Sequence, residues 1–176
     1  YDARLRLSMP RTLDERIVIV DIDEKSIERI GRWPWGRDKL ATLTQELFVR
    51  QRVAVLGFDV IFAERDNSSG LAALQALERG ALAKAPGFAE QVAKLTPTLD
   101  HDALFARSLQ GQAAVLGYYF TSDRKGHTLG SLPSAVITSA QLRGRPLAST
   151  TWNGFGANLA VLSQAAPVAG FFNTIS

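Results

Sequence analysis

The sequence contains no cysteine. This excludes disulfide bonds, thiol nucleophiles, iron–sulfur clusters and thiolate zinc sites, and it is equally compatible with a reducing cytosol and with a bacterial periplasm. Histidine is also scarce, with only His101 and His127. No two histidines are placed on one helix as a zinc enzyme would need them. Both histidines lie in segments that we expect to be exposed, so we interpret them as surface residues.

Long apolar runs and an excess of one charge are missing as well. The chain has no run of about 18 apolar residues, the length that a membrane-spanning helix needs. Its 20 basic and 17 acidic residues give a net charge of only +3. The basic residues are scattered, apart from four arginines near the start of the chain, so we expect no nucleic-acid partner.

Common catalytic signatures are absent too. There is no Gly-x-Ser-x-Gly turn of a serine hydrolase and no glycine-rich phosphate loop ending in Lys-Ser or Lys-Thr. Acid–base chemistry in this chain would therefore fall to carboxylates alone.

The residues that are present predict one α/β domain. Hydrophobic residues make up 46% of the 176 residues, which is typical of a globular protein. Apolar, β-branched runs predict strands, and stretches with helical spacing separate them. We predict a central, mainly parallel sheet of four or five strands with helices on both faces, and a helical insertion at about 67–100. The predicted strands cover 17–22, 53–62, 113–120 and 168–172.

Carboxylates follow the first two predicted strands. Asp21 and Asp23 are two residues apart, so on a strand they would share a face at its carboxyl end. Asp59 and Glu64 end the second strand, and a right-handed crossover would place the ends of both strands at one edge of the sheet. The sequence thus predicts four carboxylates at that edge.

Asp21 and Asp23 allow two interpretations. The pattern Val-Ile-Val-Asp-Ile-Asp resembles the haloacid-dehalogenase phosphatases, which implies a magnesium-dependent hydrolase using both residues. Those enzymes usually have Gly and Thr where this chain has Glu24 and Lys25. The structural alternative is that both aspartates cap the following helix or pair with an arginine, and that the short helix ends at Gly31.

Trp33 and Trp35 flank Pro34 in a loop that continues to Arg37. Two indole rings carry too much apolar area to lie free in water. The loop is therefore expected either to pack on the core or to line a pocket, and packing on the core is the structural alternative to a binding role.

Three motifs together identify a family resemblance. They are the Asp-Glu-Lys-Ser turn at 23–26, the Gly-Arg-Trp-Pro-Trp-x-Arg loop at 31–37 and the Gly-Phe-Asp-Val-x-Phe-Ala-Glu strand at 57–64. In this order, and with the later strands, they resemble the second class of the cyclase and histidine-kinase associated sensory extracellular domains (CHASE type 2). The resemblance covers nearly the whole chain.

The resemblance implies a sensor outside the bacterial inner membrane, on its periplasmic face. Such a domain would pass a small-molecule or protein signal through membrane helices to an output domain of the same polypeptide, an adenylate or guanylate cyclase or a histidine or serine/threonine kinase. Residues 1–176 would form a single extracytoplasmic domain. Residues 1–16 would extend an upstream membrane helix, and the C-terminal end of the domain would be truncated.

We expect no catalytic residues and no cofactor in such a sensor. A ligand would bind where the predicted strand ends meet the aromatic loop, with Trp33, Trp35, Arg37 and Asp59 as ligand-binding residues. A divalent cation, if one binds, would take Asp21, Asp23 and Glu64. A module whose role is to form a homodimer stays open as a third alternative.

Overall fold

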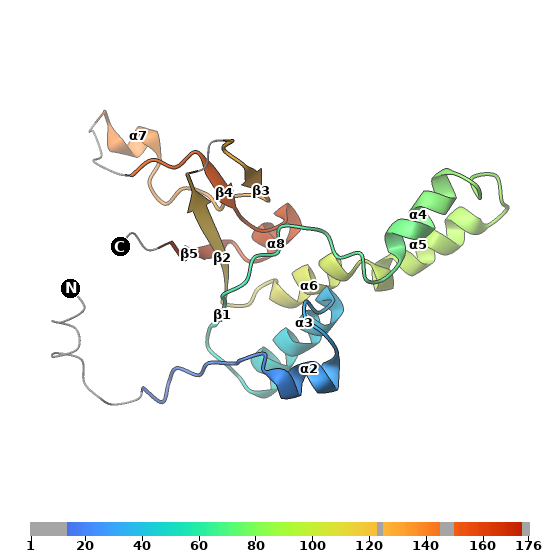
Figure 1. Cartoon of the computed structure of the whole chain (residues 1–176), viewed down its shortest axis with the longest axis horizontal. Helices are drawn as coiled ribbons and strands as arrows, with labels where there is room; N and C mark the ends of the chain where they lie inside the picture. Colours follow the sequence, from blue (N-terminus) through green and yellow to red (C-terminus); the bar gives the residue numbers. More distant parts are fainter. Residues whose placement is uncertain (1–13, 123–124, 145–149, 174–176) are drawn as a thin grey trace. The chain divides into compact units, whose positions relative to one another are not determined.

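The computed structural model describes residues 14–122, 125–144 and 150–173 (Figure 1). The chain divides into two compact units, residues 1–34 and 35–176, which we describe separately. Among the described residues, no helix is both long and apolar enough to cross a membrane. The predicted extension of a membrane helix over 1–16 falls almost wholly outside the described residues and stays a prediction.

The first unit contains one described helix, α2 (Glu24–Ile30). Asp23 is its N-cap, and the Asp23 carboxylate accepts hydrogen bonds from the backbone N–H of Ser26 at 2.9 Å and from its hydroxyl at 2.7 Å. Gly31, with a φ of 107°, follows the helix, and its N–H donates to the carbonyl of Ile27. The predicted helix and its glycine stop are confirmed, with Asp23 as the cap.

The predicted strand over residues 17–22 is wrong in this structure. These residues form no helix or strand. The side chains of Ile17, Val18, Ile19 and Val20 are between 54% and 89% exposed. A β-branched run becomes a strand only when its backbone groups pair with a neighbour, and the described residues supply no such pairing.

The second unit contains a five-stranded, mostly parallel sheet, as predicted. β2 (Ala114–Thr121) pairs in parallel with β1 (Leu56–Phe58) and with β5 (Val168–Phe171). It also pairs antiparallel with β4 (Gly154–Gly156), and β4 pairs in parallel with β3 (Thr128–Leu129). β2 is thus the central strand, which pairs with three of the other four.

Helices occupy the connections between the strands. The chain runs from α3 (Arg37–Gln45) into a π-helical turn, η1 (Glu46–Arg50), before β1. The helices α4 (Leu71–Arg79) and α5 (Phe88–Leu99) pack against each other and form the predicted insertion (Figure 1). The remaining helices are α6 (His101–Leu109), α7 (Ser139–Leu142) and α8 (Ala160–Ala165).

The core of this unit lies where α6 packs between α3 and α8. Phe62, Phe105, Leu109 and Leu162 are at most 1% exposed. Phe62 and Phe105 meet edge to face with ring centroids 5.2 Å apart, which is a favoured aromatic geometry. α6 therefore contributes Phe105 and Leu109 to the core between its two neighbouring helices.

The second strand is shorter than the predicted range 53–62, because a buried side chain takes over its pairing. Asn158 accepts a hydrogen bond from the backbone N–H of Phe62 at 2.8 Å and donates one to the carbonyl of Gly117 at 2.8 Å. The asparagine satisfies both backbone groups where the chain leaves the sheet. Residues 59–62 therefore run beside the core without joining a strand.

β3 and β4 were not predicted. β4 is a Gly-Phe-Gly segment, and such a composition is typical of a loop. A Cβ atom on Gly156 would collide with the ring of Tyr119 on β2. The close approach of the two strands requires glycine here, and this is a tertiary constraint that a glycine in a sequence does not reveal.

Candidate functional site

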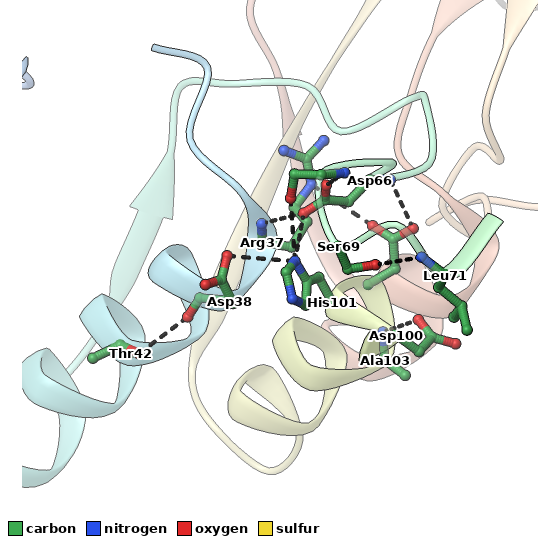
Figure 2. Close-up of polar contacts among 11 residues, drawn as sticks. Arg37, Asp38, Thr42, Asp66, Ser69, Leu71, Asp100, His101 and Ala103 are labelled. Carbon is green, nitrogen blue, oxygen red and sulfur yellow. Dashed lines mark hydrogen bonds and ion pairs between the residues drawn. The ribbon is translucent and has the colours of Figure 1, made fainter. Parts of the chain in front are cut away.

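Polar side chains from three segments meet beside the core and form what we call the Asp–His cluster (Figure 2). One segment is the first turn of α3, one is the loop after β1, and one is the first turn of α6. The members of the cluster are Arg37, Asp38, Asp66, Ser68, His101 and Asp102.

The two helices begin in different ways. Asp100 caps α6 by accepting the N–H of Ala103 at 2.9 Å, so that His101 and Asp102 occupy the first turn. Gly36 has no side chain to cap α3. Asp66 performs this role from 29 residues away, since its Oδ2 accepts the N–H of Arg37 at 2.5 Å.

Both the carboxylate and the backbone N–H of Asp66 form hydrogen bonds within the cluster. Its Oδ1 accepts the N–H of Ser68 at 2.7 Å, and its own N–H donates to Oδ2 of Asp102 at 3.0 Å. Burial acts to raise the pKa of Asp66, but the hydrogen bonds from Ser68 and Arg37 and the charge of His101 outweigh it. The pKa of Asp66 therefore lies below its usual range, and the carboxylate form is favoured.

His101 lies between two carboxylates. Its Nδ1 is 3.5 Å from Oδ1 of Asp38, 3.3 Å from Oδ2 of Asp66 and 3.2 Å from the hydroxyl of Ser68. The side chain of His101 is only 14% exposed. Figure 2 shows the imidazole linked to Asp38 on one side and to Asp66 on the other. The expectation that His101 is a surface residue is wrong.

Arg37 and Asp102 form a buried ion pair, with 3.8 Å between Nε and Oδ1. The guanidinium also lies over the ring of Phe62, 4.5 Å from its centroid. Burial raises the pKa of Asp102, although the charge of Arg37 and the N–H of Asp66 oppose the shift. For the cationic Arg37, burial disfavours the charged form and therefore lowers the pKa, and the nearby carboxylates oppose that shift. Neither Arg37 Nε nor Asp102 Oδ1 has a hydrogen bond to any described residue.

The predicted ligand-binding residues are spread over the chain. Arg37 belongs to the cluster, where it pairs with the carboxylate of Asp102. Trp35 is buried, at 6% exposure, whereas Asp59 is exposed. Trp33 is half-buried and belongs to the unit of residues 1–34, whereas Trp35 begins the other unit. A pocket walled by both indoles therefore stays a prediction.

The predicted cation ligands are also divided. Asp23 caps α2 and Asp21 is exposed, both in the first unit, whereas Glu64 is exposed in the second. The predicted meeting of Asp21, Asp23, Asp59 and Glu64 depended on a strand over 17–22, which the structure does not contain. Their role as cation ligands stays a prediction.

Sequence reasoning missed most of the Asp–His cluster. The missed residues are Asp38, Asp66, Ser68, His101 and Asp102. The available signal was the Asp-His-Asp triplet at 100–102, at the start of a predicted helix and with a further aspartate after the preceding strand. Asp66 is 36 residues from Asp102, so only the folded chain shows that they meet.

A separate pocket of about 580 Å³ lies elsewhere in the second unit. Its lining consists of Phe120, Thr150, Trp152, Phe171 and Asn173. This volume is within the range of small-molecule sites, roughly 300–1,000 Å³. Because none of these side chains is charged, the pocket suits an apolar or aromatic molecule.

Comparison with protein families finds a match that spans the chain: the model of the CHASE2 domain matches residues 1–176. The chain belongs to the CHASE2 family. CHASE2 domains are sensory domains, not catalytic ones, and they are typically extracytoplasmic parts of cyclase and kinase receptors. No curated protein and no solved structure matches the chain.

Membership in the CHASE2 family confirms the resemblance that the three motifs indicated. The structure shows the role of the first of these motifs. In this CHASE2 domain the Asp-Glu-Lys-Ser turn is the capped start of α2, in which the carboxylate of Asp23 is engaged by Ser26.

Proposed function

We propose that this CHASE2 domain is the signal-input domain of a bacterial transmembrane receptor, on the periplasmic face of the inner membrane. It receives a small-molecule or protein signal and relays it through membrane helices to a cytoplasmic output domain of the same polypeptide. The output is an adenylate or guanylate cyclase, or a histidine or serine/threonine kinase. The family match over residues 1–176 is the observation that carries this proposal.

Signal relay requires a conformational equilibrium that the stimulus shifts. The Asp–His cluster is a suitable element, because it joins the starts of α3 and α6 through one loop that has no regular structure. Its contacts depend on charge and on a few hydrogen bonds. A stimulus that changes the charge balance of the cluster would change how firmly the two helices are held together.

The location is tested in the full-length receptor. Alkaline phosphatase, which becomes active only after export, and green fluorescent protein, which fluoresces only in the cytoplasm, are each fused after residue 173. The proposal expects phosphatase activity and no fluorescence. The reverse pattern would place the domain in the cytoplasm and overturn the proposal.

The relay is tested by the output of the same receptor. Asp66→Asn removes the charge that connects α3 with His101, while Glu90→Gln removes an exposed charge on α5. We expect the first variant to change the basal cyclase or kinase activity at equal protein levels, and the second to leave it unchanged. Equal activity in wild type and both variants would contradict a role of the cluster in the relay.

A further inference from the structure

We propose that Asp38, Asp66 and His101 bind one divalent transition-metal ion, with Zn²⁺ as the representative of its class. The three side chains come from the first turn of α3, the loop after β1 and the first turn of α6. This site shares no residue with the predicted cation ligands Asp21, Asp23 and Glu64. It also goes beyond the proposed sensor function and does not depend on it.

The distances between the ligand atoms fit a bound ion. Oδ1 of Asp38, Oδ2 of Asp66 and Nδ1 of His101 all lie within 4.8 Å of one another. Nδ1 of His101 is 3.5 Å and 3.3 Å from the two oxygens. Metal–ligand bonds of about 2.1 Å at a tetrahedral angle place neighbouring ligand atoms about 3.4 Å apart. The two distances from His101 to the carboxylates thus match the spacing of ligands around one metal ion.

Glycine at position 36 lets the ligand oxygens approach the backbone closely. A Cβ atom at this residue would collide with Oδ1 of Asp38 and would lie 2.8 Å from the Ser68 hydroxyl and 3.4 Å from Oδ2 of Asp66. A side chain here would therefore displace the oxygens of the cluster. The Ser68 hydroxyl is also 3.2 Å from Nδ1 of His101, which makes it a candidate fourth ligand beside water.

The charge of the cluster favours a cation. Asp38, Asp66 and Asp102 supply three carboxylates, and Arg37, paired with Asp102, supplies one permanent positive charge. Two carboxylates then face a histidine that is 86% buried, and their repulsion in a partly desolvated site is costly unless it is compensated. A divalent ion bound to the neutral imidazole would replace the charge of His101 that otherwise acts on Asp66, and it would balance the carboxylates more fully.

A second and independent observation comes from Asp102. It is 6% exposed, and its Oδ2 accepts the N–H of the proposed ligand Asp66. Its Oδ1, which faces Arg37 within the same cluster, has no hydrogen bond to a described residue. Nε of Arg37, 3.8 Å from this oxygen, is also without a hydrogen bond to a described residue, so a water molecule would complete the network on this side of Asp102. Asp102 would act as an outer residue that orients the peptide of a ligand.

The donor set selects the class of ion. One imidazole nitrogen with carboxylate oxygens suits Zn²⁺ and neighbouring transition metals, whereas Mg²⁺ and Ca²⁺ prefer all-oxygen sites with more ligands. Three protein ligands leave one position for Ser68 or water. The bound ion would join the starts of α3 and α6, and so would stabilise the arrangement of the cluster.

Calorimetric titration of the chain, without a polyhistidine tag and in a buffer that does not chelate, tests the site directly. We expect one Zn²⁺ per chain and no comparable heat with Mg²⁺. Asp38→Ala and His101→Gln should each weaken binding at least about tenfold. The matched controls are His127→Gln, which removes the other histidine, and Glu90→Gln, which removes an exposed carboxylate on α5; both should bind as the wild type does.

Circular dichroism of each variant checks that the fold is retained, and Asp38→Ala is the safer variant because its side chain is 43% exposed. Co²⁺ supplies a second measurement, since its visible absorption reports nitrogen and oxygen ligands and should disappear in His101→Gln. A wild-type chain that binds neither ion would overturn the proposal and leave the cluster as a hydrogen-bonded network. Binding that Asp38→Ala and His101→Gln leave unchanged, or that His127→Gln abolishes, would overturn it too. These binding results are independent of receptor output, so the failure of either proposal can be recognised separately.

Discussion

Asp102 accepts the backbone N–H of Asp66 at 3.0 Å, although the two residues are 36 positions apart. This bond attaches the loop after β1 to the first turn of α6. The same carboxylate pairs with the buried guanidinium of Arg37 at the start of α3. One side chain thus connects three segments that the sequence keeps apart.

Replacing Asp102 with alanine should therefore destabilise the domain markedly. The substitution leaves the charge of Arg37 buried without its partner and the N–H of Asp66 without an acceptor. The expected loss in the free energy of unfolding is about 3 kcal/mol. Urea denaturation measures it, with Asp59→Ala as a control at an exposed carboxylate, for which we expect a change below about 0.5 kcal/mol. Equal effects of the two variants would contradict the role assigned to Asp102.

Asn158 should be equally hard to replace. Its side chain satisfies the backbone N–H of Phe62 and the carbonyl of Gly117, both in the core. Asn158→Ala leaves both groups buried without partners, at a cost of roughly 2–4 kcal/mol. Thermal and urea unfolding measure the loss. Asn67→Ala, at an exposed residue, serves as the control, and a small loss at Asn158 would mean that water replaces its amide.

Gly156→Ala should destabilise the domain, whereas Gly57→Ala should not. A Cβ atom on Gly156 would collide with the ring of Tyr119, so the substitution forces β4 away from β2 at a cost of about 1–3 kcal/mol. A Cβ atom on Gly57 meets nothing within 4 Å, and this strand residue is exposed. Gly57→Ala should leave the stability unchanged or raise it slightly. Denaturation midpoints of the two variants measure the difference, and equal midpoints would contradict the close approach of β4 to Tyr119.

The cap of α2 should depend on pH. Hydrogen bonds from Ser26 hold the pKa of Asp23 below its usual value of 3.8, since they favour the carboxylate. A folded-state pKa below the unfolded one means that the cap stabilises the helix above the unfolded pKa, and that this contribution is lost as the pH falls through the folded pKa. NMR titration of the Asp23 carboxyl carbon should give a midpoint below 3.8, and Ser26→Ala should move it upward. An identical midpoint in both proteins would show that the Ser26 hydroxyl does not lower the pKa of Asp23.

Asp21 and Asp23 should not support phosphatase chemistry. Asp23 is committed to the cap of α2, and CHASE2 domains are not catalytic. With a chromogenic phosphate ester and magnesium, the wild type and Asp21→Asn should give the same background rate. Turnover in the wild type that Asp21→Asn abolishes would favour the hydrolase interpretation over the sensor.

Much of the fold could be predicted from the sequence because its signals are local. The stop at Gly31 and the apolar runs of β2 and β5 depend on residues within one turn or one strand. The insertion at 67–100 was likewise visible from its helical spacing and glycine breaks. The run at 17–22 misled the prediction, because a β-branched segment needs a pairing partner that sequence patterns do not supply.

The sequence by itself determined the family, the α/β class and most helix ends, since capping and periodicity act over a few residues. Only the tertiary structure decided that His101 is buried beside Asp38 and Asp66, and that Asp102 pairs with Arg37. It also decided that Asn158 replaces strand pairing near Phe62. These contacts join residues that are from 35 to 96 positions apart. The packing of α3, α6 and the sheet determines which of these residues meet. Local sequence patterns do not predict that packing.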